Sequence, residues 1–99
     1  MILIVQHTVH DFSTWKSVFD EHAAVRAGHG CIGHLLYQGD DDPREVTLLL
    51  QFPTRRQADA FLADPTLRET MQRAGVEGEP RFSFVRESEA VDYARQAAA

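Results

Sequence analysis

The sequence predicts an α+β fold in which helices pack on one face of a four-stranded antiparallel sheet. Segments rich in β-branched and apolar residues indicate strands, and segments with apolar residues at every third or fourth position indicate helices. Their order is strand, helix, strand, strand, helix, strand, and 99 residues have room for one such unit. This βαββαβ order is the split βαβ pattern of ferredoxin-like sandwiches, whose right-handed crossovers place both helices on the same side of the sheet.

The first strand and helix occupy the beginning of the chain. Residues 2–9 are rich in β-branched side chains and too few for a long helix, so we expect a strand. Asp11 or Ser13 then caps a helix. This helix should run to about Ala27 and end at Gly28, which can adopt the left-handed conformation because it has no β-carbon.

Two strands in the middle of the chain form a hairpin. Residues 32–38 and 45–52 have the composition of strands, and residues 39–43 between them are a cluster typical of a turn. Because side chains alternate along a strand, the later strand has one continuous apolar face. That face is expected to contain Val46, Leu48, Leu50 and Phe52.

The second helical segment is interrupted. Thr54 and Gln57 fit a capping box at its start. Asp64 and Pro65 stop the helix and restart it, because proline is tolerated at a first helical position. The last strand is expected over residues 81–87.

Composition limits the class of protein. With 43% hydrophobic and 25% charged residues the chain is ordinary for a globular protein. We expect one domain over residues 1–88, followed by an arm or frayed tail over 89–99 in which Val91 and Tyr93 can pack on a partner. A net charge of −5 without any run of three basic residues argues against nucleic acid as a partner. The absence of a membrane span or signal core, and the single cysteine Cys31, favour no membrane association and a cytoplasmic protein.

The predicted sheet has two apolar faces. The first strand places Ile2 and Ile4 on one face and Leu3 and Val5 on the other. In the third strand Leu49 points to the face opposite to that of its apolar neighbours. Helices cover one face only. We therefore expect the other face to be covered by the same face of a second copy, which gives a homodimer.

The first helix carries an aromatic stripe. Trp15, Val18, Phe19 and His22 recur at steps of three and four and so share one helical face. A face with an indole, a phenyl and an imidazole can line a pocket for a flat organic molecule.

Histidines are the candidate bases, because imidazole titrates near neutral pH. His7 either takes a proton from a substrate or is a hydrogen-bonded structural residue of the sheet, and His22 either orients a substrate or bonds a neighbouring carboxylate. His34 and Tyr37 face opposite sides of their strand, so only one of them should face the pocket. His29, between two glycines, is expected on the surface of a loop.

The remaining aromatic residues are expected to be mostly core, with some of them, including Phe61 and Phe84, in the pocket wall. A metal site is not predicted. The run from His29 to His34 contains Cys31, but it lacks a second cysteine pair, and strand alternation separates its side chains.

Three stretches resemble the small dimeric α+β barrel proteins related to antibiotic biosynthesis monooxygenases, over about residues 2–90. They are DFSTWKSVFD at 11–20, DDPREV at 41–46 and MQRAGVEGEP at 71–80. The resemblance implies a pocket between helices and sheet for an aromatic polyketide, a quinol, a lactone or haem. Members act as cofactor-independent monooxygenases, haem-degrading enzymes, cyclases or isomerases, so the resemblance implies the fold more firmly than the reaction.

One departure from these relatives limits the transfer of catalytic residues. Quinone-forming and haem-degrading relatives generally rely on an asparagine with a tryptophan, or on an asparagine, a tryptophan and a histidine. This chain contains no asparagine. No catalytic residue is therefore carried over from them.

The leading hypothesis is a small-molecule enzyme that acts without metal or flavin on an aromatic or polyketide-like substrate, by oxygenation or by cyclisation or isomerisation. The candidate catalytic residues are His7, His22 and His34, and the candidate substrate-binding residues are Trp15, Phe19, Tyr37, Phe61 and Phe84. The alternative is a non-catalytic ligand-binding or dimeric assembly protein in which Trp15 is simply part of the core.

Overall fold

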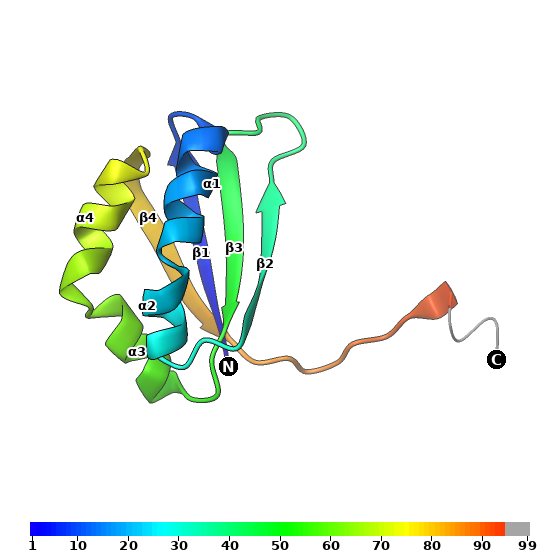
Figure 1. Ribbon diagram of the computed structural model, residues 1–99. Coiled ribbons are helices and arrows are strands. Elements are labelled where there is room, and N and C mark those ends of the chain that lie inside the picture. The colour runs from blue at the N-terminus through cyan, green and yellow to red at the C-terminus, as the bar shows by residue number, and fades with distance from the viewer. Residues whose placement is uncertain (95–99) are drawn as a thin grey trace.

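The computed structural model describes residues 1–94, and it confirms the α+β class and the predicted topology. Four strands form one antiparallel sheet in the order β2-β3-β1-β4. The helices lie on one face of this sheet (Figure 1). The elements are β1 (Ile2–Val9), α1 (Phe12–Glu21), α2 (Ala23–Gly28), β2 (Gly33–Gln38), β3 (Glu45–Gln51), α3 (Arg55–Leu62), α4 (Pro65–Arg73) and β4 (Val76–Val85).

The first helical segment is two helices, whereas the sequence predicted one. Asp11 caps α1 by accepting a hydrogen bond from the Thr14 amide at 2.9 Å, and the break comes at His22. The Phe19 carbonyl at this break accepts from the His22 amide at 3.2 Å. The helical path ends at Gly28 as predicted, but the left-handed residue is Gly30, with a φ of 89°.

The second helical segment follows its predicted interruption. The Thr54 hydroxyl accepts from the Gln57 amide at 3.2 Å and so caps α3. Asp64 caps α4 by accepting from the Thr66 amide at 2.8 Å, and Pro65 is the first residue of that helix. Two short helices therefore replace one long helix, and they can follow the curvature of the sheet.

The last strand begins five residues earlier than predicted and ends two residues earlier. Val76 and Glu77 pair with Val9 and Thr8 at the end of β1, and regular pairing resumes at Arg81 opposite Gln6. Residues 78–80 between them form a bulge, in which Gly78 has a φ of 68°. A bulge of this kind is invisible to an analysis of alternation, because the irregular residues break the two-residue period. His7 is the β1 residue opposite the shift.

The core lies between the helices and one face of the sheet. The face of β3 that was predicted to be apolar is buried there, together with Leu3, Val5 and Val9 of β1 and with Trp15 and Phe61 of the helices. The opposite sheet face has no helices over it. It presents several apolar side chains that are half-buried or exposed, namely Ile2, Ile4, Leu35, Tyr37, Leu49 and Val85.

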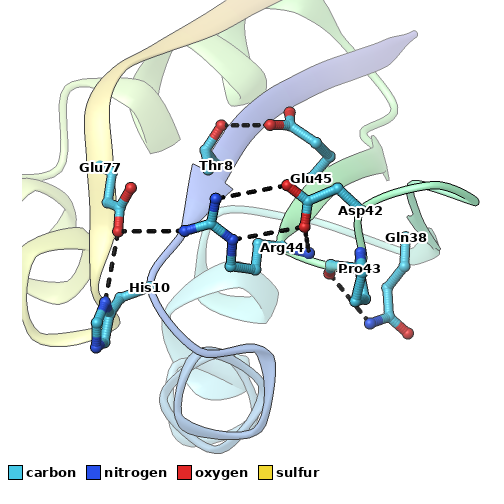
Figure 2. A network of polar contacts seen from close by, with 8 residues as sticks. All are labelled: Thr8, His10, Gln38, Asp42, Pro43, Arg44, Glu45 and Glu77. Atoms are coloured by element: carbon cyan, nitrogen blue, oxygen red, sulfur yellow. Dashed lines mark hydrogen bonds and ion pairs between the residues drawn. The ribbon is translucent and has the colours of Figure 1, made fainter.

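A polar network joins three strands at one end of the sheet (Figure 2). The Thr8 hydroxyl donates to Glu45 at 2.8 Å, and Arg44 lies 3.9 Å from Glu77. His10 lies 3.5 Å from the same Glu77 carboxylate. These contacts link β1, β3 and β4 at this end of the sheet, and exposed pairs of this type contribute little stability.

The chain leaves the sheet after β4 and runs away from the body of the molecule (Figure 1). Val91 and Tyr93 are exposed, with 80% of the Tyr93 surface accessible. Packing of this arm on a partner, and the domain boundary at residue 88, remain predictions. Residues 95–99 of the predicted arm or frayed tail lie outside the described residues. No helix in residues 1–94 is long and apolar enough to span a membrane.

Candidate functional site

A cavity of about 60 Å³ lies between the sheet and the helices. Its wall is mostly aromatic and aliphatic, with contributions from β1, β3, β4 and all four helices. The polar side chains that border it are His7, His22, Arg26 and Thr70. The aromatic ones include Trp15, Phe19, Phe61 and Phe82. The structure thus brings together at one place five of the eight residues predicted for the site.

His7 is a buried polar residue of β1 with no internal partner. It alternates with Val5 and Val9 on the helix-facing side, and it is 8% exposed. Both of its ring nitrogens are buried, and neither has a hydrogen-bond partner among the described residues. Its ring meets the Trp15 indole edge-on, with centroids 5.7 Å apart. The hydrogen-bonded structural histidine considered from the sequence is therefore not what the fold contains.

The environment of His7 has a chemical consequence. Burial lowers the pKa of His7 because the charged imidazolium loses its hydration. The ring is then neutral at physiological pH and able to accept a proton. A buried polar group without a partner destabilises a fold by about 1–3 kcal/mol, so such a group in a cavity wall marks a place where a ligand can supply the partner.

The aromatic stripe of α1 forms a stacked row beside the cavity. The Trp15 and Phe19 rings are 5.0 Å apart and almost parallel, at 10°. Phe12 continues the row on the other side of Trp15 at 5.8 Å. The row follows from helical spacing, which places every third or fourth side chain on the same face. It gives the cavity a flat, rigid wall.

His22 borders the cavity at the break between α1 and α2. Its Nε2 lies 3.4 Å from the Thr66 hydroxyl oxygen, and that hydroxyl donates to Asp64. Because the hydroxyl hydrogen is engaged by Asp64, the His22 Nε2–H is the donor to Thr66. Burial, followed by the nearby Arg26 charge, lowers the pKa of His22.

His29 is half-buried, in contrast to the exposed loop position expected from its two glycine neighbours. Its Nε2–H donates to Asp64 at 2.7 Å, and its ring packs edge-on against Phe61 at 6.0 Å. This hydrogen bond and those from Thr66 hold the pKa of Asp64 well below its usual range. The carboxylate thus connects the end of α2 to the start of α4.

Arg26 is a pocket residue that the sequence analysis missed. It is 6% exposed, and its Nη1 donates to the Phe19 carbonyl at 2.7 Å. Its guanidinium carbon lies 3.6 Å above the centre of the Phe19 ring. The available signal was spacing, since Arg26 lies four residues after His22 and continues the stripe across the helix break.

Three predicted residues lie outside the cavity. His34 touches the Phe19 ring edge-on at 5.0 Å, but it lies on β2, the edge strand of the sheet, and is exposed. Tyr37 lies on the open face of the sheet, opposite Thr47. Phe84 packs under the Arg55 guanidinium at 3.4 Å, and Phe82 borders the cavity in its place.

A larger cleft of about 580 Å³ lies between α4 and β4. Leu67, Met71 and Phe82 border both this cleft and the cavity, so they form the wall between the two. None of the residues of α4 itself is fully buried. Leu67 and Met71 lie four residues apart on one face of α4, but helical spacing alone does not indicate that this face separates two spaces.

The described residues contain no group of three or more histidine, cysteine, aspartate or glutamate side chains placed to hold a metal ion. In the run that raised this possibility, the Cys31 thiol donates to the Gly33 carbonyl at 3.4 Å. His29 is engaged by Asp64, as described above.

Comparison with known proteins finds relatives by structure only. No family profile matches the chain, and no curated protein matches it significantly. Among solved structures it is similar to SnoaB, a cofactor-independent oxygenase from Streptomyces nogalater, with 21% identity over 88% of this chain and 93% of that one and a TM-score of 0.69. A provisionally named antibiotic biosynthesis monooxygenase from Bordetella bronchiseptica gives 14% identity, coverage of 89% and 96%, and a TM-score of 0.77. Rv0793 from Mycobacterium tuberculosis is 16% identical over 91% of this chain and 97% of that one, with a TM-score of 0.67.

These likenesses extend over nearly the whole of each chain, and their TM-scores establish a common fold. The chain therefore has the ferredoxin-like fold shared by the antibiotic biosynthesis monooxygenase-like proteins, as the sequence resemblance implied. Fold alone does not determine activity, and at these identities function has to be argued from the site.

Proposed function

We propose that this protein is a homodimeric small-molecule enzyme of the antibiotic biosynthesis monooxygenase-like type. It acts without metal or flavin on an aromatic or polyketide-like substrate, by oxygenation or by cyclisation or isomerisation. The observation that carries the proposal is His7, a neutral imidazole in a cavity wall with both ring nitrogens unpaired within the described chain. The likeness to a cofactor-independent oxygenase supports the same class of reaction.

The proposed chemistry begins with a proton transfer. His7 takes the proton of a phenol or an activated carbon onto a ring nitrogen, and the substrate becomes a phenolate or an enolate. In oxygenation this anion passes one electron to molecular oxygen, and the two radicals combine to a peroxide anion. The His7 imidazolium returns its proton to this anion, and the resulting hydroperoxide loses water to leave a carbonyl, so that one oxygen atom enters the product and the other leaves as water. In cyclisation or isomerisation the anion attacks or rearranges internally, and the His7 imidazolium returns the proton. The apolar wall keeps water away from the anion.

A ring-shaped substrate needs more space than the cavity provides. An apolar cavity that holds benzene has a volume of about 150 Å³, whereas this one has about 60 Å³. The wall that separates it from the 580 Å³ cleft contains Met71, whose side chain has three rotatable bonds. We propose that the substrate enters between α4 and β4 and displaces Met71.

The three candidate bases receive unequal support. His7 borders the cavity and is unpaired. His22 also borders it, but its Nε2 is directed to Thr66, which suits an orienting role. His34 lies outside the cavity and is the weakest candidate. Trp15, Phe19 and Phe61 supply the proposed aromatic contacts with the substrate.

The homodimer is supported by the uncovered face of the sheet. That face carries Leu35 at 57% and Tyr37 at 52% exposure, together with the partly buried Leu49. A second copy of the same face would cover them. The free thiol of Cys31 supports the proposed cytoplasmic location.

The test compares turnover with binding. Binding of anthrones, hydroquinones and lactones is followed by quenching of Trp15 fluorescence, and turnover by oxygen uptake and product analysis. We expect His7→Gln to abolish turnover of the ligand that binds and to change its dissociation constant by no more than about threefold. The matched control, His34→Gln, keeps turnover. Equal losses of binding and turnover in His7→Gln would refute the role of His7 as the base.

The alternative function is a non-catalytic binding or assembly protein, which the small volume of the cavity favours. A binding protein would give saturable quenching by a compound of the panel without any turnover, whereas a purely assembling protein would give no saturable quenching at all. Trp15 would then be a core residue only, and Trp15→Ala would lower the free energy of unfolding by about 3–5 kcal/mol with no effect on any binding.

A further inference from the structure

Arg26 is the one permanently charged side chain among the described residues that border the cavity. It is 6% exposed, so almost all of its surface is removed from water. A guanidinium remains protonated in proteins, even though burial lowers the pKa of Arg26. A full positive charge is therefore held in a wall that is mostly aromatic and aliphatic.

The charge of Arg26 has no acidic partner within residues 1–94. The ion pairs of that region all involve other cations. Asp20, whose charge acts on Arg26, holds the Lys16 ammonium with both carboxylate oxygens at 2.7 Å. The other nearby group, the Cys31 thiol, donates to a backbone carbonyl. Buried charges in proteins are normally paired, so the pairing of Arg26 is incomplete.

The contacts that Arg26 makes within the described residues use few of its hydrogen-bond donors. One of its five N–H donors is given to the Phe19 carbonyl, which completes the end of α1. Its flat face rests on the Phe19 ring. Capping of α1 explains one donor, but it does not require a charge in the cavity wall. The planar guanidinium of Arg26, beside the stacked Trp15 and Phe19 rings, is suited to bind an anionic oxygen attached to an aromatic ring.

We propose that Arg26 is an anion-binding residue of this cavity and that the ligand is an aromatic carboxylate. The ring lies against Trp15 and Phe19, and the carboxylate accepts hydrogen bonds from the Arg26 guanidinium. This inference rests on the proposed function, because it assumes that the cavity and cleft take a ring-shaped ligand, and it narrows the substrate class to acids.

The test uses pairs of ligands that differ only in charge. The pairs are 4-nitrobenzoate with 4-nitrobenzamide, and 2-naphthoate with 2-naphthamide, and binding is measured by titration calorimetry on the 99-residue protein. Wild-type protein should bind each acid about ten- to a hundredfold more tightly than its amide, the ratio expected for a charge-assisted hydrogen bond. Equal affinity for acid and amide would overturn the inference without any variant.

Variants then test whether Arg26 is the cause of the preference for acids over amides. Arg26→Met, which has similar length and no charge, should reduce the ratio to about one, and Arg26→Lys should keep part of it because the charge remains. The matched control is Arg55→Met, which removes another arginine stacked on a phenylalanine but lies away from the cavity. Circular dichroism establishes that each variant is folded. An unchanged ratio in a folded Arg26→Met, or an equal loss in Arg55→Met, would overturn the assignment.

The two proposals fail in different ways. If neither acids nor amides bind, the cavity takes no ring-shaped ligand, and the proposed function and this inference both fail. If acids and amides bind equally and the protein turns over a neutral substrate, only the inference about Arg26 fails. If acids bind preferentially but His7→Gln retains turnover, the inference stands and His7 is not the base.

Discussion

His7 is the residue whose polar groups are least satisfied by the packing around it. It occupies a position between Val5 and Val9 where an aliphatic side chain would bury its surface at no polar cost. The imidazole instead places two nitrogens in the core without partners among the described residues. Such a residue lowers stability and is explained if a ligand or substrate completes its hydrogen bonding.

The first prediction concerns acid stability. Because burial lowers the pKa of folded His7 while the unfolded value stays near 6.5, the unfolded chain binds the additional proton, and the free energy of unfolding falls as pH decreases below about 6.5. His22 and His34, whose pKa values are also lowered, act in the same direction. His7→Leu should therefore show a smaller loss of stability between about pH 7.5 and 5.5 than wild type, as measured by urea denaturation. An undiminished loss would contradict the buried state of His7.

Among the helices α1 to α4, α4 is the least deeply buried. None of its residues is fully buried, and it forms one side of both the cavity and the cleft. Its attachment at the N-terminus is polar, through Asp64, which caps the helix and also accepts from His29 at 2.7 Å. Its C-terminal end is held by the Arg73–Glu21 ion pair at 3.1 Å. The stretch between the two ends has no fully buried residue, which suits it to move aside for a ligand.

The second prediction tests this attachment. Asp64→Ala removes the cap of α4 and the bond to His29 together, and we expect the free energy of unfolding to fall by about 1–2 kcal/mol. The control is Asp59→Ala, which removes only an exposed pair with Arg55 and should cost less than about 0.5 kcal/mol. Urea denaturation of both variants gives the comparison. Similar losses in the two would mean that Asp64 is an ordinary surface residue.

At the scale of the whole molecule, the two faces of the sheet differ in how they are covered. The helix-facing side contains the core and the cavity, and the other side leaves Leu35, Tyr37 and Val85 exposed. A chain of this size has little stability to spare, so apolar surface of this kind is expected to be covered in solution.

The third prediction concerns the oligomer. We expect wild-type protein to be a dimer by sedimentation or light scattering, and Leu35→Glu to be a monomer, because the new charge would be buried in the interface without a partner. Leu35 is already 57% exposed in the single chain, so the change should leave the fold intact. The matched control, Ala60→Glu on the exposed side of α3, should remain dimeric. A monomeric wild type, or an unaffected Leu35→Glu dimer, would exclude this interface.

The accuracy of prediction followed the range of the interactions involved. The strand at residues 2–9 and the restart of the helix at Pro65 were located correctly, because alternation and proline geometry act between near neighbours. The break at His22 and the early start of β4 at Val76 were not located correctly. The first is accompanied by the hydrogen bond from Arg26 to the Phe19 carbonyl, and the second by a bulge, and neither feature follows from a periodic pattern.

By itself, the sequence determined the order of the elements, the topology of the sheet and the aromatic stripe led by Trp15, since these depend on periodicity and caps. Only the tertiary structure decided which members of each face meet. Phe82 and Phe84 share one face of β4, yet only Phe82 borders the cavity. Arg26 enters its wall because α2 crosses the sheet beside Phe19. Alternation fixes the side on which a residue lies, whereas the crossing of helices over the sheet fixes where space is left between them.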